Sequence, residues 1–408
     1  MHSTIKKPSL RWLAFTCVCL FFLFEFVVRI EPSLAASDIA HFLGLSNTEF
    51  GVLASLFFWV YAPMQLVVGL ALDRFGVRRT LVPAVLLCAL GAALFAASNQ
   101  LALTAVGRLL TGFGASFAFV GALYVVNHQF APERFAVLSG IVNAMGMLGA
   151  AVGAVALSGL IEVNGWRPVF LLTGAAGAGL FVLAFLFLHG VRTNESRNSH
   201  LLAPLRTVFS SRRIWLIAVV GSLFYMPVNV FAGLWGQQEM IKDHTLSPVQ
   251  AETAVSMIYW GMAAGSVLSG IVSDWLGHRK WLVVVTALLA ALAYSLAIYG
   301  PTTSVLQSAA LLFMGGLFGG GQMLTFAMAK EGEPTEVSGS VIAFVNMVGI
   351  GSALIFQPLL GYLVDLEHGS FAIAASTIPL CLLASALLAL LVREQRHPDH
   401  ISATRATT

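Results

Sequence analysis

The sequence predicts an all-α integral membrane protein with twelve transmembrane helices in two pseudo-symmetric six-helix bundles. Three observations support this fold class. Hydrophobic residues make up 58% of the 408 residues, charged residues only 10%, and the mean hydropathy is +0.85. Apolar stretches of about 20 residues, the length that crosses a bilayer, recur along the chain. The third observation is an internal repeat, which is typical of secondary transporters.

The apolar stretches fall into two sets of six. We place them at 12–34, 48–70, 80–98, 101–127, 135–161 and 166–189, and then at 214–237, 249–272, 280–299, 304–328, 337–363 and 369–392. The first could be a signal peptide, because Lys6 and Lys7 precede it. We interpret it as a membrane helix, since it is long enough to span and the count of twelve requires it.

The two sets define the expected domains. Residues 1–190 form the N-terminal bundle, 191–213 a cytoplasmic linker, 214–392 the C-terminal bundle and 393–408 a cytoplasmic tail. If both termini are cytoplasmic, 18 of the 22 Lys and Arg residues lie on that side, as the positive-inside rule requires. The outer loops then carry acids: Glu31, Asp38, Glu49, Asp243, Asp365 and Glu367. We therefore expect a multi-pass protein of the bacterial inner membrane with both termini in the cytoplasm.

The repeat is clearest in a charged loop after the second span of each half. The first copy reads Gly69-Leu-Ala-Leu-Asp73-Arg74-Phe-Gly76-Val-Arg78-Arg79, and the second copy, 201 residues later, begins at Gly270 and carries Asp274 and Gly277. The first run resembles the G-x-x-x-D-R-x-G-R-[RK] loop of the major facilitator superfamily (MFS). The resemblance covers nearly the whole chain and implies the MFS fold, a monomeric chain and transport by alternating access.

The resemblance also implies a mechanical role for this loop. The expected gating residues are Gly69, Asp73, Arg74, Gly76, Arg78, Arg79 and Asp274. Asp73 is expected at the positive N-terminal end of helix eleven. The arginines are expected to pair with Glu133 or Glu331 when the cytoplasmic side is closed, which favours the outward-open form. The alternative is that the basic residues only hold the loop inside the cell.

Several classes of site are not expected. The glycine run Gly315–Gly321 follows no strand and precedes no Lys-Ser/Thr pair, so it is not a nucleotide loop. No metal-ligand spacing and no Ser/His/Asp set is evident, so we expect no metal, no cofactor and no enzyme activity. The net charge of +3 is too small to suggest nucleic-acid binding. The expected partners are a small solute, protons and the lipid bilayer.

Glu25 and Arg29 in the first span are the most informative residues. They are four residues apart and therefore share one helix face. Ionisable groups within a membrane normally face a water-filled cavity or a partner. A guanidinium suits a carboxylate or phosphate, and a desolvated carboxylate beside it can take up a proton. The hypothesis is that protonation of Glu25 releases Arg29 to bind an anionic substrate. The alternatives are a structural ion pair, or an Arg29 that reaches the outer surface.

Within the superfamily, helices one to five are most similar to the anion:cation symporters. The matching residues are Arg29, then Leu34-Ala-Ala-Ser-Asp, the run Gly51-Val-Leu-Ala-Ser-Leu-Phe-Phe-Trp59-Val-Tyr-Ala-Pro-Met-Gln65, and Gly165-Trp166-Arg167-x-x-Phe170. The run Phe231-Ala-Gly-Leu-Trp235-Gly236 resembles the intraphagosomal amino-acid transporters of proteobacteria. Val28 and Ala115 stand where such symporters usually carry acids. Arg108 resembles the arginine motif of helix four, which would tune proton affinity or pair with backbone carbonyls.

Four further polar residues are expected to bind substrate. Asn143, Tyr225, Asn229 and Asn346 fall near span midpoints, where transporter sites lie. Hydrogen bonding between helices would also explain them. The expected function is proton-coupled uptake of a small organic anion or amino acid. The alternative is a proton-driven drug or metabolite exporter, although Gly149-Ala-Ala-Val-Gly153 lacks the helix-five proline of drug antiporters.

Overall fold

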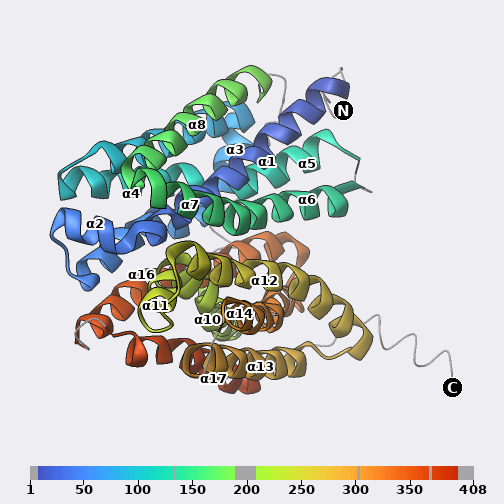
Figure 1. The fold of residues 1–408 in the computed structure, drawn as a ribbon. Helices are drawn as coiled ribbons and strands as arrows, with labels where there is room; N and C mark the ends of the chain where they lie inside the picture. Colours follow the sequence, from blue (N-terminus) through green and yellow to red (C-terminus); the bar gives the residue numbers. More distant parts are fainter. Residues whose placement is uncertain (1–7, 132–133, 189–207, 301–303, 367–369, 394–408) are drawn as a thin grey trace.

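The computed structural model describes residues 8–131, 134–188, 208–300, 304–366 and 370–393, and these residues are almost entirely helical. Two helical bundles lie one above the other in Figure 1, the first blue to green and the second yellow to red. The expected linker and tail lie mostly outside the described residues.

The described part of the first bundle contains ten elements. They are α1 (Pro8–Ile30), the 3₁₀ helix η1 (Glu31–Ala35), α2 (Ala36–Leu43), α3 (Asn47–Ala97), α4 (Leu101–Ala115), α5 (Ala118–Gln129), α6 (Phe135–Leu148), the π-helix η3 (Gly149–Gly153), α7 (Ala154–Asn164) and α8 (Trp166–Phe187). The second bundle contains α10 (Arg212–Met226), the π-helix η5 (Pro227–Trp235), α11 (Gly236–Lys242), α12 (Pro248–Leu276), α13 (Arg279–Tyr299), α14 (Val305–Gly319), the 3₁₀ helix η6 (Gly320–Met323), α15 (Leu324–Lys330), α16 (Thr335–Leu366) and α17 (Ala372–Leu391).

The described residues include eleven helical stretches that are long and apolar enough to cross a membrane. One of them, α3, has 51 residues and is interrupted at Gly76, whose φ of 77° and ψ of 163° are not helical. A straight helix of that length would measure about 75 Å, more than twice the apolar thickness of a bilayer. α3 therefore comprises two spans, and the predicted twelve-span fold class is confirmed.

The internal repeat is visible in local structure as well as in sequence. The second span of each half starts with a capping box, Ser46 with Glu49 in α3 and Ser247 with Gln250 in α12. Each capping box satisfies free N–H groups at a helix start. Ser37 donates a hydrogen bond of 2.7 Å to Oε1 of Gln238, which stands 201 residues later. Residues at equivalent repeat positions thus meet between the bundles.

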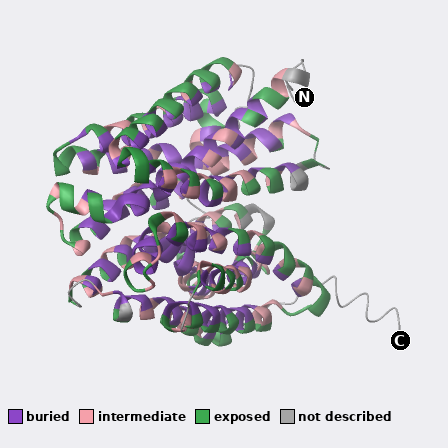
Figure 2. Cartoon of the chain, in the orientation of Figure 1, coloured by how far each residue is buried: buried purple, intermediate pink, exposed green. Residues whose placement is uncertain are grey.

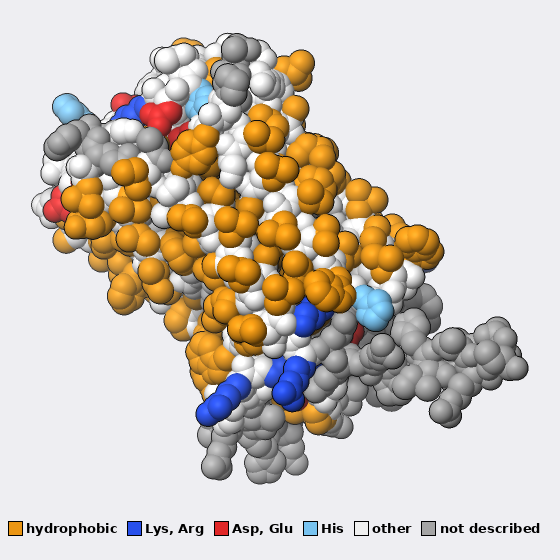
Figure 3. Space-filling model, turned by 90° about the horizontal axis from the view of Figure 1, so that it is seen from below, with side chains coloured by type: hydrophobic (Ala, Val, Ile, Leu, Met, Phe, Trp, Pro, Cys, Tyr) orange, Lys and Arg blue, Asp and Glu red, His pale blue; other side chains and the backbone are white. Residues whose placement is uncertain are grey.

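The surface of the molecule has the polarity of a membrane protein. Buried residues concentrate inside and between the bundles, whereas the outward sides of the helices are exposed (Figure 2). Much of that exposed surface is apolar, and in Figure 3 several Lys and Arg side chains gather near one end, whereas most of the visible Asp and Glu side chains lie near the other. We call the end with Arg74, Arg78, Arg79, Arg213 and Arg279 the basic face, and the other end the opposite face.

One expected loop residue is not in a loop. Glu31 lies in η1, which packs against α7 and η5, and its side chain is only 4% exposed. The expectation that it is an outer-loop acid is wrong, because the chain stays helical beyond α1 and keeps Glu31 inside the bundle.

The bundles are in tight contact at the opposite face. Asp365 at the end of α16 accepts hydrogen bonds from the start of α3: 3.0 Å from N of Asn47, 2.8 Å from its Nδ2, 2.8 Å from N of Thr48 and 2.5 Å from its Oγ1. A Cβ on Gly51 would lie 2.6 Å from the carbonyl oxygen of Gln357. α12 packs in the same way against α7 and η3. We call these contacts the opposite-face gate.

The same helices are apart at the basic face. A Cβ on Gly69 of α3 or on Gly339 of α16 would meet no atom of the described residues within 4 Å. The interface between α3 and α16 is therefore closed at the opposite face and open at the basic face.

Candidate substrate-binding cavity

A cavity of about 710 Å³ lies between the bundles. Its wall extends from Arg29 and Tyr61 to Asp73 and Gly339 near the basic face, and both bundles contribute to it. Aromatic side chains form much of the first bundle's wall, among them Phe22, Phe26 and Phe119. The cavity is therefore accessible from the basic face and ends beneath the opposite-face gate.

Arg29 is the cation at the inner end of this cavity. Its side chain is 7% exposed and lines the cavity, whereas Glu25 behind it is fully buried. Nε and Nη2 of Arg29 both donate to the same oxygen, Oε1 of Glu25, and the Nε bond is 2.8 Å long. Oε2 of Glu25 is buried and has no hydrogen-bond partner among the described residues. The pair is thus formed as expected, and one carboxyl oxygen is left available to carry a proton.

Aromatic rings surround the Arg29 guanidinium. Its Cζ lies 4.5 Å from the ring centre of Phe26, 4.9 Å from that of Tyr61 and 5.7 Å from that of Phe57. A cation–π contact contributes about 0.5–1 kcal/mol at an exposed site and about 2 kcal/mol when water is excluded. These rings and Glu25 stabilise a charge at this depth and fix the direction of the guanidinium.

Arg108 does not line the cavity. Its Nη1 donates to the carbonyl oxygen of Val28 at 3.0 Å, and its Nη2 donates to those of Arg29 and Ala54 at 3.3 and 3.1 Å. Of the two expected roles, the one that pairs Arg108 with backbone carbonyls is observed. These bonds hold α1 and α3 in place at the level of Arg29.

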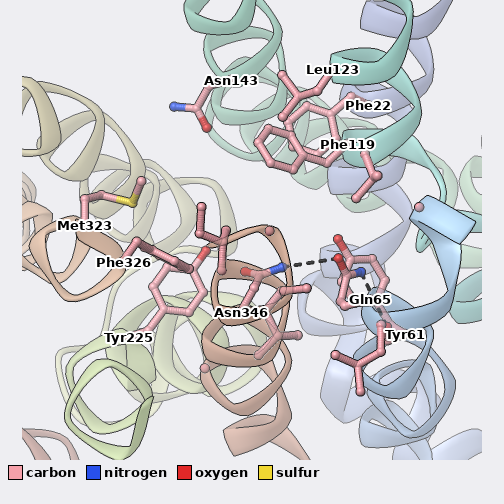
Figure 4. A pocket seen from close by; sticks show the side chains of 18 of the residues that line it. Phe22, Tyr61, Gln65, Phe119, Leu123, Asn143, Tyr225, Met323, Phe326 and Asn346 are labelled. Carbon is pink, nitrogen blue, oxygen red and sulfur yellow. Dashed lines mark hydrogen bonds between the residues drawn. The ribbon is translucent and has the colours of Figure 1, made fainter. Parts of the chain in front are cut away.

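A hydrogen bond crosses the cavity between the two bundles. Nδ2 of Asn346 in α16 donates to Oε1 of Gln65 in α3 at 3.2 Å, and Nε2 of Gln65 lies 3.4 Å from the carbonyl oxygen of Tyr61 (Figure 4). Tyr225 lines the cavity on the same side as Asn346, and Asn143 projects from α6 on the other. Of the four expected polar residues, the structure brings three into this cavity: Asn143, Tyr225 and Asn346.

The fourth, Asn229, lies elsewhere. It belongs to the π-helix η5, which follows Tyr225 and begins at Pro227. Its Nδ2 donates to the carbonyl oxygen of Gly349 at 3.2 Å. It lines a second cavity of about 10 Å³ together with Arg29 and Tyr259. Asn229 is therefore behind Arg29 rather than in the large cavity, and its binding role stays a prediction.

Tyr61 and Gln65 also line the cavity, although they were not among the four polar residues favoured for substrate binding. Gln65 carried only a weak signal, since an amide in an apolar span is explained equally well by a helix-helix hydrogen bond. The aromatic wall had no such signal, since phenylalanines at these spacings also occur in ordinary helix packing.

Two of the seven expected gating residues lie at the open mouth of the cavity. Gly69 and Asp73 line the cavity, Arg74 lies over the Phe75 ring, and Arg78 lies over the Phe185 ring. Glu331 pairs with Arg279 of its own bundle at 3.0 Å, and Glu133 is outside the described residues. The pairing of the arginines across the bundles was expected only for the form closed at this side, and it stays a prediction.

Comparison with known proteins identifies the family of the chain. The sequence profile of the Major Facilitator Superfamily matches residues 14–239 and 217–407. The chain belongs to the Major Facilitator Superfamily. Among solved structures, a bacterial homologue of the human lysosomal transporter Spinster, in an inward-facing and occupied conformation, has a TM-score of 0.74 at 15% identity. It covers 95% of this chain and 96% of that chain, and at this identity it supports the fold alone.

Curated relatives of this MFS protein are named as transporters. A probable sulfoacetate transporter of Cupriavidus necator is 24% identical over 66% of this chain. The match covers 66% of that transporter, just under two thirds of its length. A probable L-galactonate transporter of Escherichia coli is 26% identical over 86% of this chain and 82% of its own. A probable galactarate/D-glucarate transporter of Bacillus subtilis is 23% identical over 97% of this chain and 96% of its own length. The chain is thus a membrane transporter and not an enzyme.

Proposed function

We propose that this MFS protein is a proton-coupled transporter that takes up small organic anions, carboxylates above all, by alternating access. The observation that carries the proposal is Arg29, a guanidinium at the inner end of a cavity formed by both bundles. A planar fork of donors matches the geometry of a carboxylate or sulfonate. The names of the relatives agree with this chemistry, since sulfoacetate, galactonate and galactarate are all organic acids.

The Glu25–Arg29 pair offers a route to coupling. Without substrate, the carboxylate neutralises the guanidinium. When an anion binds Arg29, Glu25 loses its partner and takes a proton from the solution. The site then contains a neutral acid and a new ion pair, so its net charge is zero in both states. This exchange avoids an unpaired charge inside the membrane, which would be costly.

Polar groups around Arg29 would select among anions. The Gln65–Asn346 pair, Tyr225 and Asn143 present donors and acceptors to the same cavity. Hydroxyl groups of a sugar acid could replace the bond between Gln65 and Asn346 and so connect the two bundles. We place the basic face in the cytoplasm, in accordance with the positive-inside rule. The conformation described above is then inward-open, and one chain encloses the whole site, as a monomer requires.

A ligand-binding experiment tests the substrate class. The melting temperature of the purified protein would be measured with sulfoacetate, galactonate, galactarate and glucarate, and with galactitol as an uncharged control. We expect stabilisation by at least one acid and none by galactitol, and loss of this response in Arg29→Lys. Arg213→Lys is the matched control, because Arg213 lies at the basic face and donates to the carbonyl oxygen of Met328. Equal responses in Arg29→Lys and wild type would refute the site.

A transport experiment tests the coupling. In proteoliposomes, Glu25→Gln should retain exchange of the bound acid across the membrane and lose accumulation driven by a pH gradient. Unchanged gradient-driven accumulation would remove Glu25 from the coupling role and leave the role of Arg29 intact.

A further inference from the structure

Glu252 in α12 is a buried acid that the mechanism above does not use. Its side chain is 1% exposed, and within the described part of the chain its buried Oε2 has no hydrogen-bond partner. Glu25 pairs with Arg29, and Glu239 pairs with His244. No ion pair or hydrogen bond of Glu252 is found among the residues that the structure describes. An ionised carboxylate is very unfavourable in such surroundings. In this conformation, burial without a partner favours the neutral, protonated form of Glu252 over the carboxylate.

Glu252 lies on the side of α12 that faces the first bundle's cavity wall. Glu252, Tyr259 and Ser266 are spaced by seven residues and share one helix face. Ser266 lines the large cavity, and Tyr259 lines the cavity of about 10 Å³ with Arg29. That volume holds about one water molecule. Seven residues correspond to a rise of about 10.5 Å, so Glu252 lies two turns beyond Tyr259 toward the opposite face.

The opposite-face gate closes directly beside Glu252. Nε2 of Gln237 donates at 3.1 Å to Oγ of Ser158 in α7, and at 3.1 Å to the carbonyl oxygen of Pro248 in α12. Val249 packs against Gly159 of α7. Pro248 and Val249 precede Glu252 by about one helical turn. Separation of α7 from α12 would therefore expose Glu252 to the solution at the opposite face.

We propose that Glu252 is a second proton-binding site of this transporter, and that the opposite-face gate closes over it only when its carboxyl group is protonated. A proton from the solution at the opposite face converts the carboxylate to the acid, and the acid can be buried. Tyr259 and the small cavity then lie between Glu252 and the Arg29 site. The use of this proton in transport rests on the function proposed above, whereas the effect of protonation on the gate does not.

Other titratable or charged groups lie on the elements packed against the outer half of α12 or on α12 itself. They are Glu162 on α7, Glu239 and Lys242 on α11, Asp243 and His244 in the following loop, Tyr294 on α13, and Tyr259 and Asp274 on α12, with Asp274 at the basic end. The Glu239–His244 pair is the main competitor, because it also lies at the opposite face and can titrate near neutral pH. Glu239→Gln is therefore the matched control for Glu252→Gln.

The test measures the gate without any substrate. Nitroxide labels at Val163→Cys of α7 and Leu306→Cys of α14 report the separation of the bundles at the opposite face, and these side chains are 82% and 80% exposed. Distances would be recorded by pulsed electron resonance in lipid nanodiscs from about pH 5 to about pH 9. In the wild type and in Glu239→Gln, the population with the long distance should rise about tenfold as pH increases. In Glu252→Gln it should stay low throughout, with a change below about twofold.

Two results would overturn the proposal. One is a long-distance population that does not change with pH in the wild type. The other is a long-distance population in Glu252→Gln that rises with pH as it does in the wild type. If Glu252→Gln does not fold, infrared spectroscopy of the wild type decides. Gate closure must then be accompanied by the carbonyl band of a protonated carboxyl group, and its absence refutes the proposal. Organic acids that fail to bind while the gate responds as expected would refute only the proposed substrate class.

Discussion

Asp365 provides the sharpest test of how the opposite-face gate is held closed. Its carboxylate accepts the N–H groups of Asn47 and Thr48 and two of their side-chain donors. These N–H groups belong to the first turn of α3, which has no acceptor of its own for them. The next N–H group, that of Glu49, donates to Oγ of Ser46, which belongs to the same bundle. The start of α3 is thus capped in part by a side chain of the other bundle, and only while the gate is closed.

Asp365→Asn should shift the conformational equilibrium toward the form with this gate open. The amide retains one oxygen, so about two of the four hydrogen bonds are lost, and its NH₂ group faces donors. A hydrogen bond to a charged group contributes about 1.5–3 kcal/mol. We take about 1 kcal/mol for each lost bond, because Asp365 is partly exposed to solvent. The closed form would lose about 2 kcal/mol, which corresponds to an approximately 30-fold change in the equilibrium.

The assay is the distance measurement between labels at Val163→Cys and Leu306→Cys at a fixed pH. We expect the long-distance population to grow markedly in Asp365→Asn. Asp243→Asn is the matched control, because Asp243 is an exposed acid of the same face. An Asp365→Asn distribution that matches the Asp243→Asn control would show that these hydrogen bonds do not hold the gate, and the reasoning would be wrong.

Three further predictions follow from the same interfaces. Gly51→Ala should favour the form open at the opposite face, because its Cβ would lie 2.6 Å from the carbonyl oxygen of Gln357. Gly69→Ala is the control and should be tolerated in the present form, since its Cβ would meet no described atom within 4 Å. Equal label distances in the two variants would contradict this prediction. Asp73→Asn should lower the transport rate and leave substrate affinity nearly unchanged, as uptake and binding measurements can show; an unaltered rate would return the loop to a purely topological role. His244 lies 3.2 Å from the Glu239 carboxylate, and this hydrogen bond raises the pKa of His244 in the folded protein. The pair should therefore stabilise the fold fully below the usual histidine pKa. This stabilisation should be lost as pH rises through the raised pKa of His244 in the folded protein. The melting-temperature difference between wild type and His244→Gln should therefore shrink at alkaline pH, and a constant difference would contradict the assignment.

The fold could be predicted because the bilayer allows few solutions. Span length, the repeat and the capping boxes at equivalent positions all indicate two bundles of six helices. Continuity at Gly76 was not predicted, because a charged loop between two spans gives no sign that helical structure continues on both sides of one glycine. The buried position of Glu31 was missed for a similar reason, since an acid after an apolar stretch usually marks the end of a span.

The site was predictable where a charge stands in an apolar span. The cost of burying Glu25 and Arg29 made their pairing an expectation from the spacing alone. Amides carry a weaker signal, because a helix-helix hydrogen bond satisfies them equally well. Asn346 faces the cavity and Asn229 bonds to Gly349, and only the rotation of each helix distinguishes them. That rotation depends on packing between distant segments, which one sequence does not reveal.

The central claim is that Arg29 receives the negative group of the substrate. The most direct measurement is an experimental structure of the protein with a stabilising acid, such as galactarate, bound. The account predicts a carboxylate within hydrogen-bond distance of the Arg29 guanidinium, with the rest of the ligand beside Gln65 and Asn346. A ligand bound in the cavity with its carboxylates on other groups, and Arg29 still paired with Glu25, would contradict it.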